Sequence, residues 1–170
     1  MSGRHLVIMG PMGIGKTTLA NRLADALDRP MRDSDRDIEA LFGQPGRAIA
    51  AERGVDALHD LEAAVLLGAL ADPNPLVICA AGWVVEDERC RSALARRAVV
   101  LVLDLAVPAL IERLAAVEDE HRRPMDPAEV EALAVRRRPL YEEVADRWLD
   151  ASRDPEALAD EIVDQYADWA

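Results

Sequence analysis

Eight residues near the N-terminus constrain the fold more than any other part of the chain. Residues 10–17 read Gly-Pro-Met-Gly-Ile-Gly-Lys-Thr and match the pattern G-x-x-x-x-G-K-[ST] in full. A short apolar run at residues 6–9 precedes them, and Leu19, Leu23 and Leu27 follow at helical spacing. A buried strand, a glycine-rich turn and a helix N-terminus in this order surround an anion with backbone N–H groups. The sequence therefore predicts a phosphate-binding loop in an α/β domain.

The residue types of this loop suit the triphosphate of a nucleotide. Glycines let the backbone approach phosphate oxygens, and Lys16 places a compact charge beside the β- and γ-phosphates. Thr17 offers a hydroxyl to a Mg²⁺ ion. Nucleotide contacts are expected from Gly10, Met12, Gly13, Ile14, Gly15, Lys16, Thr17 and Thr18.

Lysine usage indicates which nucleotide the loop binds. Of the 20 basic residues 19 are arginine, and Lys16 is the one lysine of the sequence. GTPases usually read guanine with an Asn-Lys-x-Asp motif, which needs a second lysine. ATP is therefore the expected phosphoryl donor, with Mg²⁺ as its companion ion.

Alternating apolar and amphipathic segments indicate β-α units along the remaining chain. Further strands are expected at residues 30–32, 76–79 and 98–105. Helices are expected at residues 17–27, 38–70, 108–114 and 155–166, with breaks near residues 43–46 and at Gly54. We predict a single domain over residues 1–170 with a P-loop NTPase fold, in which helices flank a five-stranded parallel sheet. Residues 117–129 are charged without an apolar face and are expected to form a mobile lid.

Composition argues against several classes of protein. The net charge of −12 and an isoelectric point near 4.6 disfavour nucleic-acid and anionic-membrane partners. We expect neither a membrane span, since no run of about 18 apolar residues is present, nor a signal peptide. Cys79 and Cys90 form neither a disulfide framework nor a metal-site spacing, so we expect reduced thiols and a cytoplasmic location. We expect a monomer, with a homodimer left open.

Four further segments, in order after the loop, resemble the shikimate kinase family of small P-loop kinases. Residues 30–35 (Pro-Met-Arg-Asp-Ser-Asp) resemble the family's apolar-Asp-Thr-Asp segment, and residues 123–124 are similar to the Arg-Pro of its lid. Residues 137–145 resemble its Arg-x-Pro-Leu-Tyr stretch, and residues 153–155 (Arg-Asp-Pro) resemble its adenine-contacting loop. The resemblance covers nearly the whole chain. It implies ATP-dependent phosphoryl transfer to a hydroxyl of a small molecule.

The resemblance implies roles in the transfer for three residues besides Lys16 and Thr17 of the loop. Asp33 would lie near the Mg²⁺ ion together with Thr17. Asp35 would hold the acceptor hydroxyl and could take its proton. Arg123 would reach from the lid to the transferring phosphate. The expected catalytic residues are therefore Lys16, Asp35 and Arg123.

The resemblance also assigns residues to the two ligands. Arg113, Arg153 and Pro155 would flank the adenine ring of ATP. Arg137 would bind a carboxylate of the acceptor, because a guanidinium group matches a carboxylate with two parallel hydrogen bonds. The implied acceptor is shikimate or a related hydroxylated compound.

The acceptor pocket departs from the family pattern at two places. Where the family has an arginine for the shikimate carboxylate, this chain has His59, which is shorter and mostly neutral at pH 7. Where the family has three glycines after the third strand, this chain keeps Gly82 but carries Ala81 and Trp83 beside it. We expect His59 and Trp83 to change the acceptor preference. Acceptor contacts are expected from Asp35, His59, Gly82, Trp83 and Arg137.

Other functions stay open at this point. A nucleoside or nucleotide kinase shares the loop and the lid, and Arg47 and Arg53 could bind its second ligand. A gluconate-type sugar kinase has a similar size but fits the Arg-x-Pro-Leu-Tyr stretch less well. A nucleotide-binding module without kinase activity would not need Thr17, Asp35 and Arg123 together.

Overall fold

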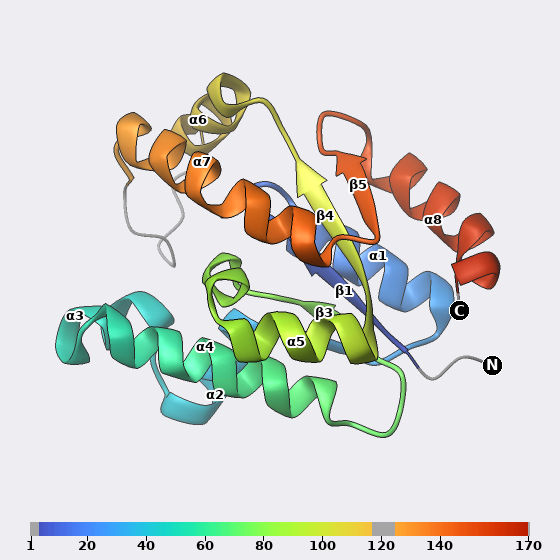
Figure 1. The fold of residues 1–170 in the computed structure, drawn as a ribbon, viewed down its shortest axis with the longest axis horizontal. Helices are drawn as coiled ribbons and strands as arrows, with labels where there is room; N and C mark the ends of the chain where they lie inside the picture. Colours follow the sequence, from blue (N-terminus) through green and yellow to red (C-terminus); the bar gives the residue numbers. More distant parts are fainter. Residues whose placement is uncertain (1–3, 117–124, 170) are drawn as a thin grey trace.

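Five parallel strands form one sheet at the centre of the molecule (Figure 1). The computed structural model describes residues 4–116 and 125–169. The strand order across the sheet is β2-β3-β1-β4-β5, so the first strand lies in the middle. The strands are β1 (His5–Met9), β2 (Met31–Asp33), β3 (Val77–Cys79), β4 (Ala98–Asp104) and β5 (Arg147–Asp150). The order changes direction at β1, and in open parallel sheets ligands bind beyond the carboxyl ends of the strands at such a point.

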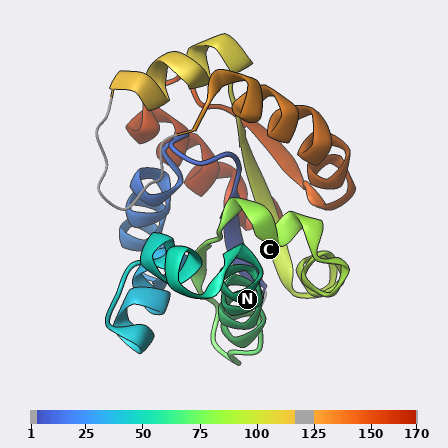
Figure 2. The ribbon, with the colours of Figure 1, turned by 90° about the vertical axis from the view of Figure 1, so that its left-hand side faces the viewer.

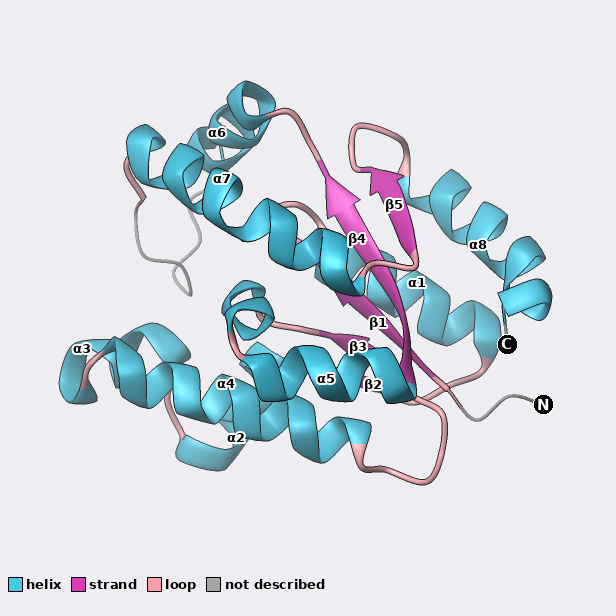
Figure 3. Ribbon diagram, viewed as in Figure 1, coloured by secondary structure: helices cyan, strands magenta, loops and turns pink. Residues whose placement is uncertain are grey.

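Helices cover both faces of the sheet, which explains why its central strands are apolar throughout. Along β1, Leu6 and Ile8 pack into one core, whereas Val7 and Met9 pack into the other, and all four are fully buried. The first core is closed by α1 (Lys16–Leu27) and α8 (Pro155–Trp169). The second core is closed by α4 (Val55–Leu70), α5 (Glu88–Arg97) and α7 (Pro127–Val144), as Figure 3 shows.

Shorter elements gather at the carboxyl ends of the strands. They are α2 (Ser34–Phe42), α3 (Gly46–Arg53), the 3₁₀ helix η1 (Gly82–Glu86) and α6 (Val107–Ala116). In Figure 2 the loop after β1 and the helix η1 lie between the α2–α4 group and the α6–α7 group. The fold therefore brings the phosphate loop and the segment after β3 to the same place.

Most sequence-based boundaries are confirmed to within three residues. The expected helical stretch 38–70 is divided into α2, α3 and α4 at Gly43 and Gly54, two glycines with positive φ. The structure adds α5 and α7 and places β5, none of which the apolar pattern located. In α7 the pattern is obscured by three successive arginines and by Pro139 within the helix, and in β5 only Leu149 is buried.

The start of α7 revises the end of the expected lid. The Asp126 side chain caps this helix by accepting a hydrogen bond of 2.8 Å from the Ala128 N–H, and Pro127 occupies the first turn. Residues 127–129 therefore belong to the helix, while residues 117–124 of the expected lid lie outside the described residues. Within the described ranges, no helix is long and apolar enough to cross a membrane, and Cys79 and Cys90 are free, buried thiols.

Candidate active site

The phosphate loop folds as its glycines predict. Gly10, Gly13 and Gly15 have φ angles of 141°, 76° and 105°, a region that residues with a Cβ rarely adopt. A Cβ on Gly10 would also lie 2.8 Å from the backbone oxygen of Leu103 in β4. Glycine is therefore required at position 10 both by the backbone angle and by the neighbouring strand.

The N-terminus of α1 is open to an anion. Gly15 precedes the helix without a side-chain cap, and the first turn contains no acidic residue. The Lys16 ammonium lies over the loop, where its Nζ donates hydrogen bonds of 3.0 Å to the Gly10 oxygen and 2.9 Å to the Pro11 oxygen. A cation and uncapped N–H groups thus converge on the same small volume, which suits the phosphates of a nucleotide.

Two oxygen donors that could hold a divalent cation meet beside the loop. The Thr17 Oγ1 donates a 3.0 Å hydrogen bond to Asp33 Oδ2, and the Asp33 side chain is almost fully buried. Asp33 also caps α2, because its Oδ1 accepts from the Asp35 N–H at 3.0 Å. Nearby, burial raises the pKa of the Cys79 thiol to about 12, so the sulfur 3.6 Å from Thr17 is protonated. A hydroxyl and one carboxylate fit Mg²⁺, which takes few protein ligands and completes its shell with water and phosphate oxygens.

A pocket beside the loop has the residues expected around adenine. Arg113, Arg153 and Pro155 line it together with residues 13–15 of the loop. Arg113 donates from Nη1 to the Ile14 oxygen at 2.9 Å and from Nη2 to the Ala151 oxygen at 3.1 Å. This arginine therefore ties the phosphate loop to the chain after β5, so its position serves the structure as well as the pocket.

Gly82 joins the nucleotide half of the site to the acceptor half. A Cβ at this position would lie 3.3 Å from the Gly10 oxygen and 3.3 Å from Arg137 Nη1. The Gly82 carbonyl also accepts a 3.3 Å hydrogen bond from the Tyr141 hydroxyl. Arg137 and the phosphate loop thus both approach position 82, where a side chain would be tightly packed against them.

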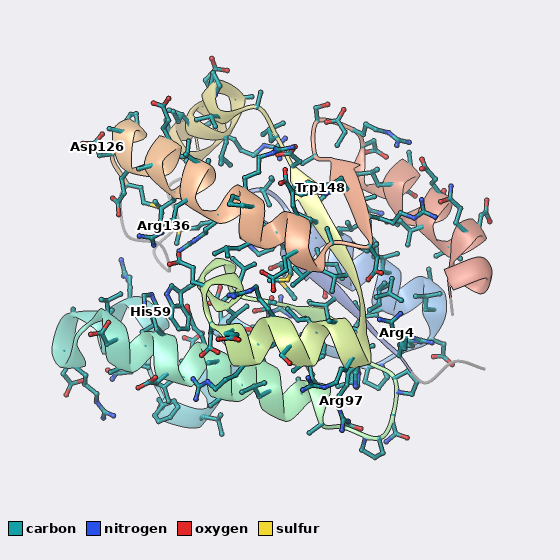
Figure 4. The ribbon with its side chains drawn as sticks, viewed as in Figure 1. Arg4, His59, Arg97, Asp126, Arg136 and Trp148 are labelled. Carbon is teal, nitrogen blue, oxygen red and sulfur yellow. The ribbon has the colours of Figure 1, made fainter. Side chains whose placement is uncertain are left out.

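His59 and Trp83 form one wall of the expected acceptor site. Their rings are stacked with centroids 4.1 Å apart and planes at 6°. Burial and the charge of Arg137 lower the pKa of His59 below its usual value of 6.5. The histidine that occupies the family's arginine position is therefore neutral at pH 7 and part of an aromatic surface. Figure 4 shows His59 on α4 and Arg136 on α7 at the same end of the molecule.

Arg137 is paired with an acid that the sequence motifs did not single out. Its Nε donates a 2.6 Å hydrogen bond to Glu86 Oε1, and Arg136 Nη2 donates to the same oxygen at 2.7 Å. Burial alone would raise the pKa of Glu86, but the two arginines outweigh it and hold the pKa below its usual range. Glu86 lies at the end of η1, and no short motif surrounds it, so only the fold identifies it as part of the site.

Glu62 is a buried acid whose ionised form is disfavoured by its surroundings. It lies on α4 with 9% of its surface exposed, and its Oε2 has no hydrogen-bond partner among the described residues. Burial raises the pKa of Glu62 to about 7, and the charge of Asp35 adds to this, while Arg137 and Lys16 oppose it. Asp35, Lys16 and Arg137 therefore all act electrostatically on this one buried carboxyl group.

The structure brings most of the predicted site residues into two groups. The phosphate loop, Thr17 and Asp33 meet as expected, and so do Gly82, Trp83, His59 and Arg137. Of the expected loop contacts, Thr18 lines the adenine pocket, whereas Met12 is 38% exposed and is not among the lining residues. Arg123 lies outside the described residues and stays a prediction. Asp33 and Asp35 also stabilise the N-terminus of α2, so their cation and acceptor roles would be additional to a capping role.

The sheet order and the loop after its central strand define the class of protein. This is an α/β protein of the P-loop NTPase fold, with a nucleotide site at the carboxyl ends of its strands. A model of the family described as shikimate kinase matches residues 12–167, so the chain belongs to the shikimate kinase family. It is therefore an ATP-dependent small-molecule kinase, and the fold and enzyme class expected from the sequence are confirmed.

Individual relatives agree with this assignment. Shikimate kinase 1 of Citrobacter koseri is 34% identical over 149 residues, which covers 84% of each chain. Shikimate kinase of Shewanella frigidimarina is 32% identical and covers 95% of this chain and 96% of its own. The structure of shikimate kinase from Acinetobacter baumannii in complex with shikimate has a TM-score of 0.88 at 28% identity, covering 97% of this chain and 93% of its own. A gluconokinase from Sinorhizobium meliloti, at 16% identity and a TM-score of 0.65, shares the fold alone.

Proposed function

We propose that this kinase transfers the γ-phosphoryl group of ATP to a hydroxyl of shikimate or a closely related hydroxylated compound. The observation that carries the proposal is the position of Gly82. A Cβ at this position would lie 3.3 Å from both the Gly10 oxygen of the phosphate loop and Arg137 Nη1, so the loop and the guanidinium approach the same point. A small acceptor that binds Arg137 would therefore have a hydroxyl next to the phosphates of the nucleotide, as in-line transfer requires.

The donor would be ATP bound through the phosphate loop. The backbone N–H groups of residues 12–18 and the Lys16 ammonium would hold the phosphates, with adenine between Arg113, Arg153 and Pro155. Thr17 and Asp33 would hold a Mg²⁺ ion, directly or through water. The ion would supply charge neutralisation at the phosphate oxygens when bound.

The acceptor half would position and deprotonate one hydroxyl. Asp35 would accept a hydrogen bond from that hydroxyl and take its proton as the new bond forms. Arg137 would bind the acceptor's carboxylate, and Arg123 would stabilise charge on the transferring group. His59 and Trp83 present an aromatic wall where the family pattern has an arginine and a glycine, and we propose that they set the acceptor preference.

A screen of acceptors tests the function. ATP consumption is measured with shikimate as reference and with ring polyols, hydroxy acids, gluconate and nucleosides, and each product is identified by mass spectrometry. We expect a phosphorylated product from shikimate or from a related ring acid, and none with Lys16→Ala. Turnover of gluconate or a nucleoside alone would contradict the proposal. Tight ATP binding without any phosphorylated product would favour the alternative of a binding module.

The same preparation tests the remaining expectations. We propose that the protein acts as a monomer in the cytoplasm, with a homodimer as the alternative, on the basis of its composition alone. Light scattering during size-exclusion chromatography gives the mass of the particle, for which 18.6 kDa is the monomer value.

A further inference from the structure

The Glu86 carboxylate is bound to Arg137, the arginine on which the proposed acceptor site depends. Its Oε1 accepts 2.6 Å and 2.7 Å hydrogen bonds from Arg137 and Arg136. The Arg137 and Glu86 side chains are only 15% and 19% exposed, so water screens this pair weakly. By contrast, the Arg136 side chain is 59% exposed. Arg137 is therefore the partner whose availability to a ligand Glu86 affects most.

The surroundings of Arg137 make this pairing costly for an anionic acceptor. Glu62, His59, Tyr141 and Glu86 all interact electrostatically with Arg137. His59 is neutral where the family pattern has a second arginine, and Glu62 adds partial negative charge near pH 7. A carboxylate that reached Arg137 would meet one guanidinium whose Nε is already bound to an anion.

We propose that Glu86 is an internal carboxylate that competes with the acceptor's carboxylate for Arg137 and so weakens the preference of this kinase for acidic acceptors. An incoming carboxylate must either displace Glu86 from Nε or bind the Nη groups beside Gly82 while Glu86 remains. Both routes are opposed by repulsion between two carboxylates on one partly buried cation. Glu86 acts through Arg137, so it is a positioning residue and not a catalytic one.

The variant Glu86→Gln separates charge from shape. The amide oxygen can still accept hydrogen bonds from Arg137 and Arg136, so the guanidinium stays in place, but the competing charge is gone. We expect the Kd of shikimate, measured by calorimetry, to fall about tenfold. For methyl shikimate, which has no carboxylate charge, we expect a change of less than about twofold. In turnover assays the gain should lie in KM and not in kcat.

Glu143→Gln is the matched control. Glu143 lies on α7 and also binds an arginine, since Arg91 Nε donates to it at 3.0 Å, but no hydrogen bond or ion pair joins it to Arg137 in the described structure. The substitution Glu143→Gln removes the same charge as Glu86→Gln. We expect it to leave the affinity for shikimate and for methyl shikimate unchanged. An equal gain in both variants would show a general charge effect and overturn the proposal.

Other outcomes separate this inference from the proposed function, on which it rests. Unchanged or weaker shikimate binding in Glu86→Gln overturns the inference even if the wild-type enzyme phosphorylates shikimate. Failure of both proteins to bind shikimate also overturns it, because Glu86 would not be what limits binding. Tighter shikimate binding in Glu86→Gln supports it even if the product screen identifies another acceptor and the proposed function fails.

Discussion

The two halves of the active site are built by different means. The nucleotide half consists largely of backbone from one continuous segment, residues 10–18, held by positive-φ glycines and a helix N-terminus. The acceptor half consists of side chains from α4, η1 and α7, which are far apart in the sequence. A backbone site tolerates little change, because a Cβ on one of its positive-φ glycines or the loss of a phosphate-facing N–H alters its shape. A side-chain site can change its ligand one residue at a time while the fold stays the same.

The largest effect should follow a change of the one lysine in the nucleotide half. Lys16→Arg keeps the positive charge but replaces a compact ammonium by a broad planar group, which does not fit between the phosphates and the loop. We expect kcat/KM to fall about 10³-fold with every acceptor. Steady-state kinetics and the melting temperature are measured together, to show that the protein remains folded.

Arg22→Lys is the control for this exchange. Arg22 lies on the same helix, is exposed and pairs with Glu156 on α8 at 3.5 Å. Replacing the Arg22 guanidinium by a lysine ammonium should leave kcat/KM unchanged. If Lys16→Arg retained more than about a tenth of the activity, a compact ammonium would not be required and the distinction between the halves would weaken.

A second test compares two glycines with positive φ. Gly10→Ala places a Cβ 2.8 Å from the Leu103 oxygen, at a residue whose φ is 141°. Backbone strain and steric overlap therefore add, and we expect the free energy of unfolding to fall by roughly 2–4 kcal/mol. Gly54→Ala has a φ of 92° but nothing within 4 Å of its Cβ, so only strain of about 1 kcal/mol should appear. Chemical denaturation measures both. Equal losses would mean that the contact with the Leu103 oxygen in β4 adds nothing to the cost of a Cβ at position 10.

The buried acid of the acceptor half gives a pH-dependent prediction. The pKa of Glu62 is about 7 in the folded protein and near 4.5 when unfolded, so the folded state holds this proton more tightly. Stability from this group is therefore greatest below pH 4.5 and is lost as the pH rises through 7. Glu62→Gln should stabilise the protein by about 1 kcal/mol at pH 5 and about 3 kcal/mol at pH 8.

Urea denaturation at the two pH values checks this prediction. The exposed Glu131→Gln serves as control, and it should change stability by the same small amount at both pH values. A stabilisation by Glu62→Gln that did not grow with pH would show that Glu62 is ionised with a partner.

The contrast between the halves also explains what the sequence could predict. The phosphate loop, Thr17 and the strands β1 and β4 follow from local patterns, because the chemistry requires neighbouring residues in a fixed order. The His59–Trp83 stack and the Glu86–Arg137 pair depend on how α4, η1 and α7 pack, and no local pattern encodes that packing. His59 and Trp83 could be identified because they depart from a family pattern. Glu86 belongs to none of the motifs that were compared, so the sequence did not point to it. The strand β5 was not located because, at the edge of the sheet, it buries one residue in four.

The smallest expected effect concerns the lost arginine. His59→Arg would place a guanidinium three residues before Glu62 on α4, within reach of the unpaired Oε2, and it could still stack on Trp83. We expect the KM for shikimate to fall about tenfold and the stabilisation by Glu62→Gln at pH 8 to shrink, because Glu62 would gain a partner. Replacing Ala81 and Trp83 by glycine in addition should increase the gain.

Ala64→Arg tests whether this gain needs the site. Ala64 is exposed on the same helix, so the variant adds the same charge away from Trp83, and the KM should not change. If His59→Arg gave no gain on shikimate, the stacked histidine would not be what weakens acidic acceptors. Glu86 would then be the remaining determinant, because among the described residues it is the carboxylate hydrogen-bonded to Arg137. If both His59→Arg and Glu86→Gln lowered KM, the double variant would show whether they act on one carboxylate site, since gains at a shared partner are less than additive.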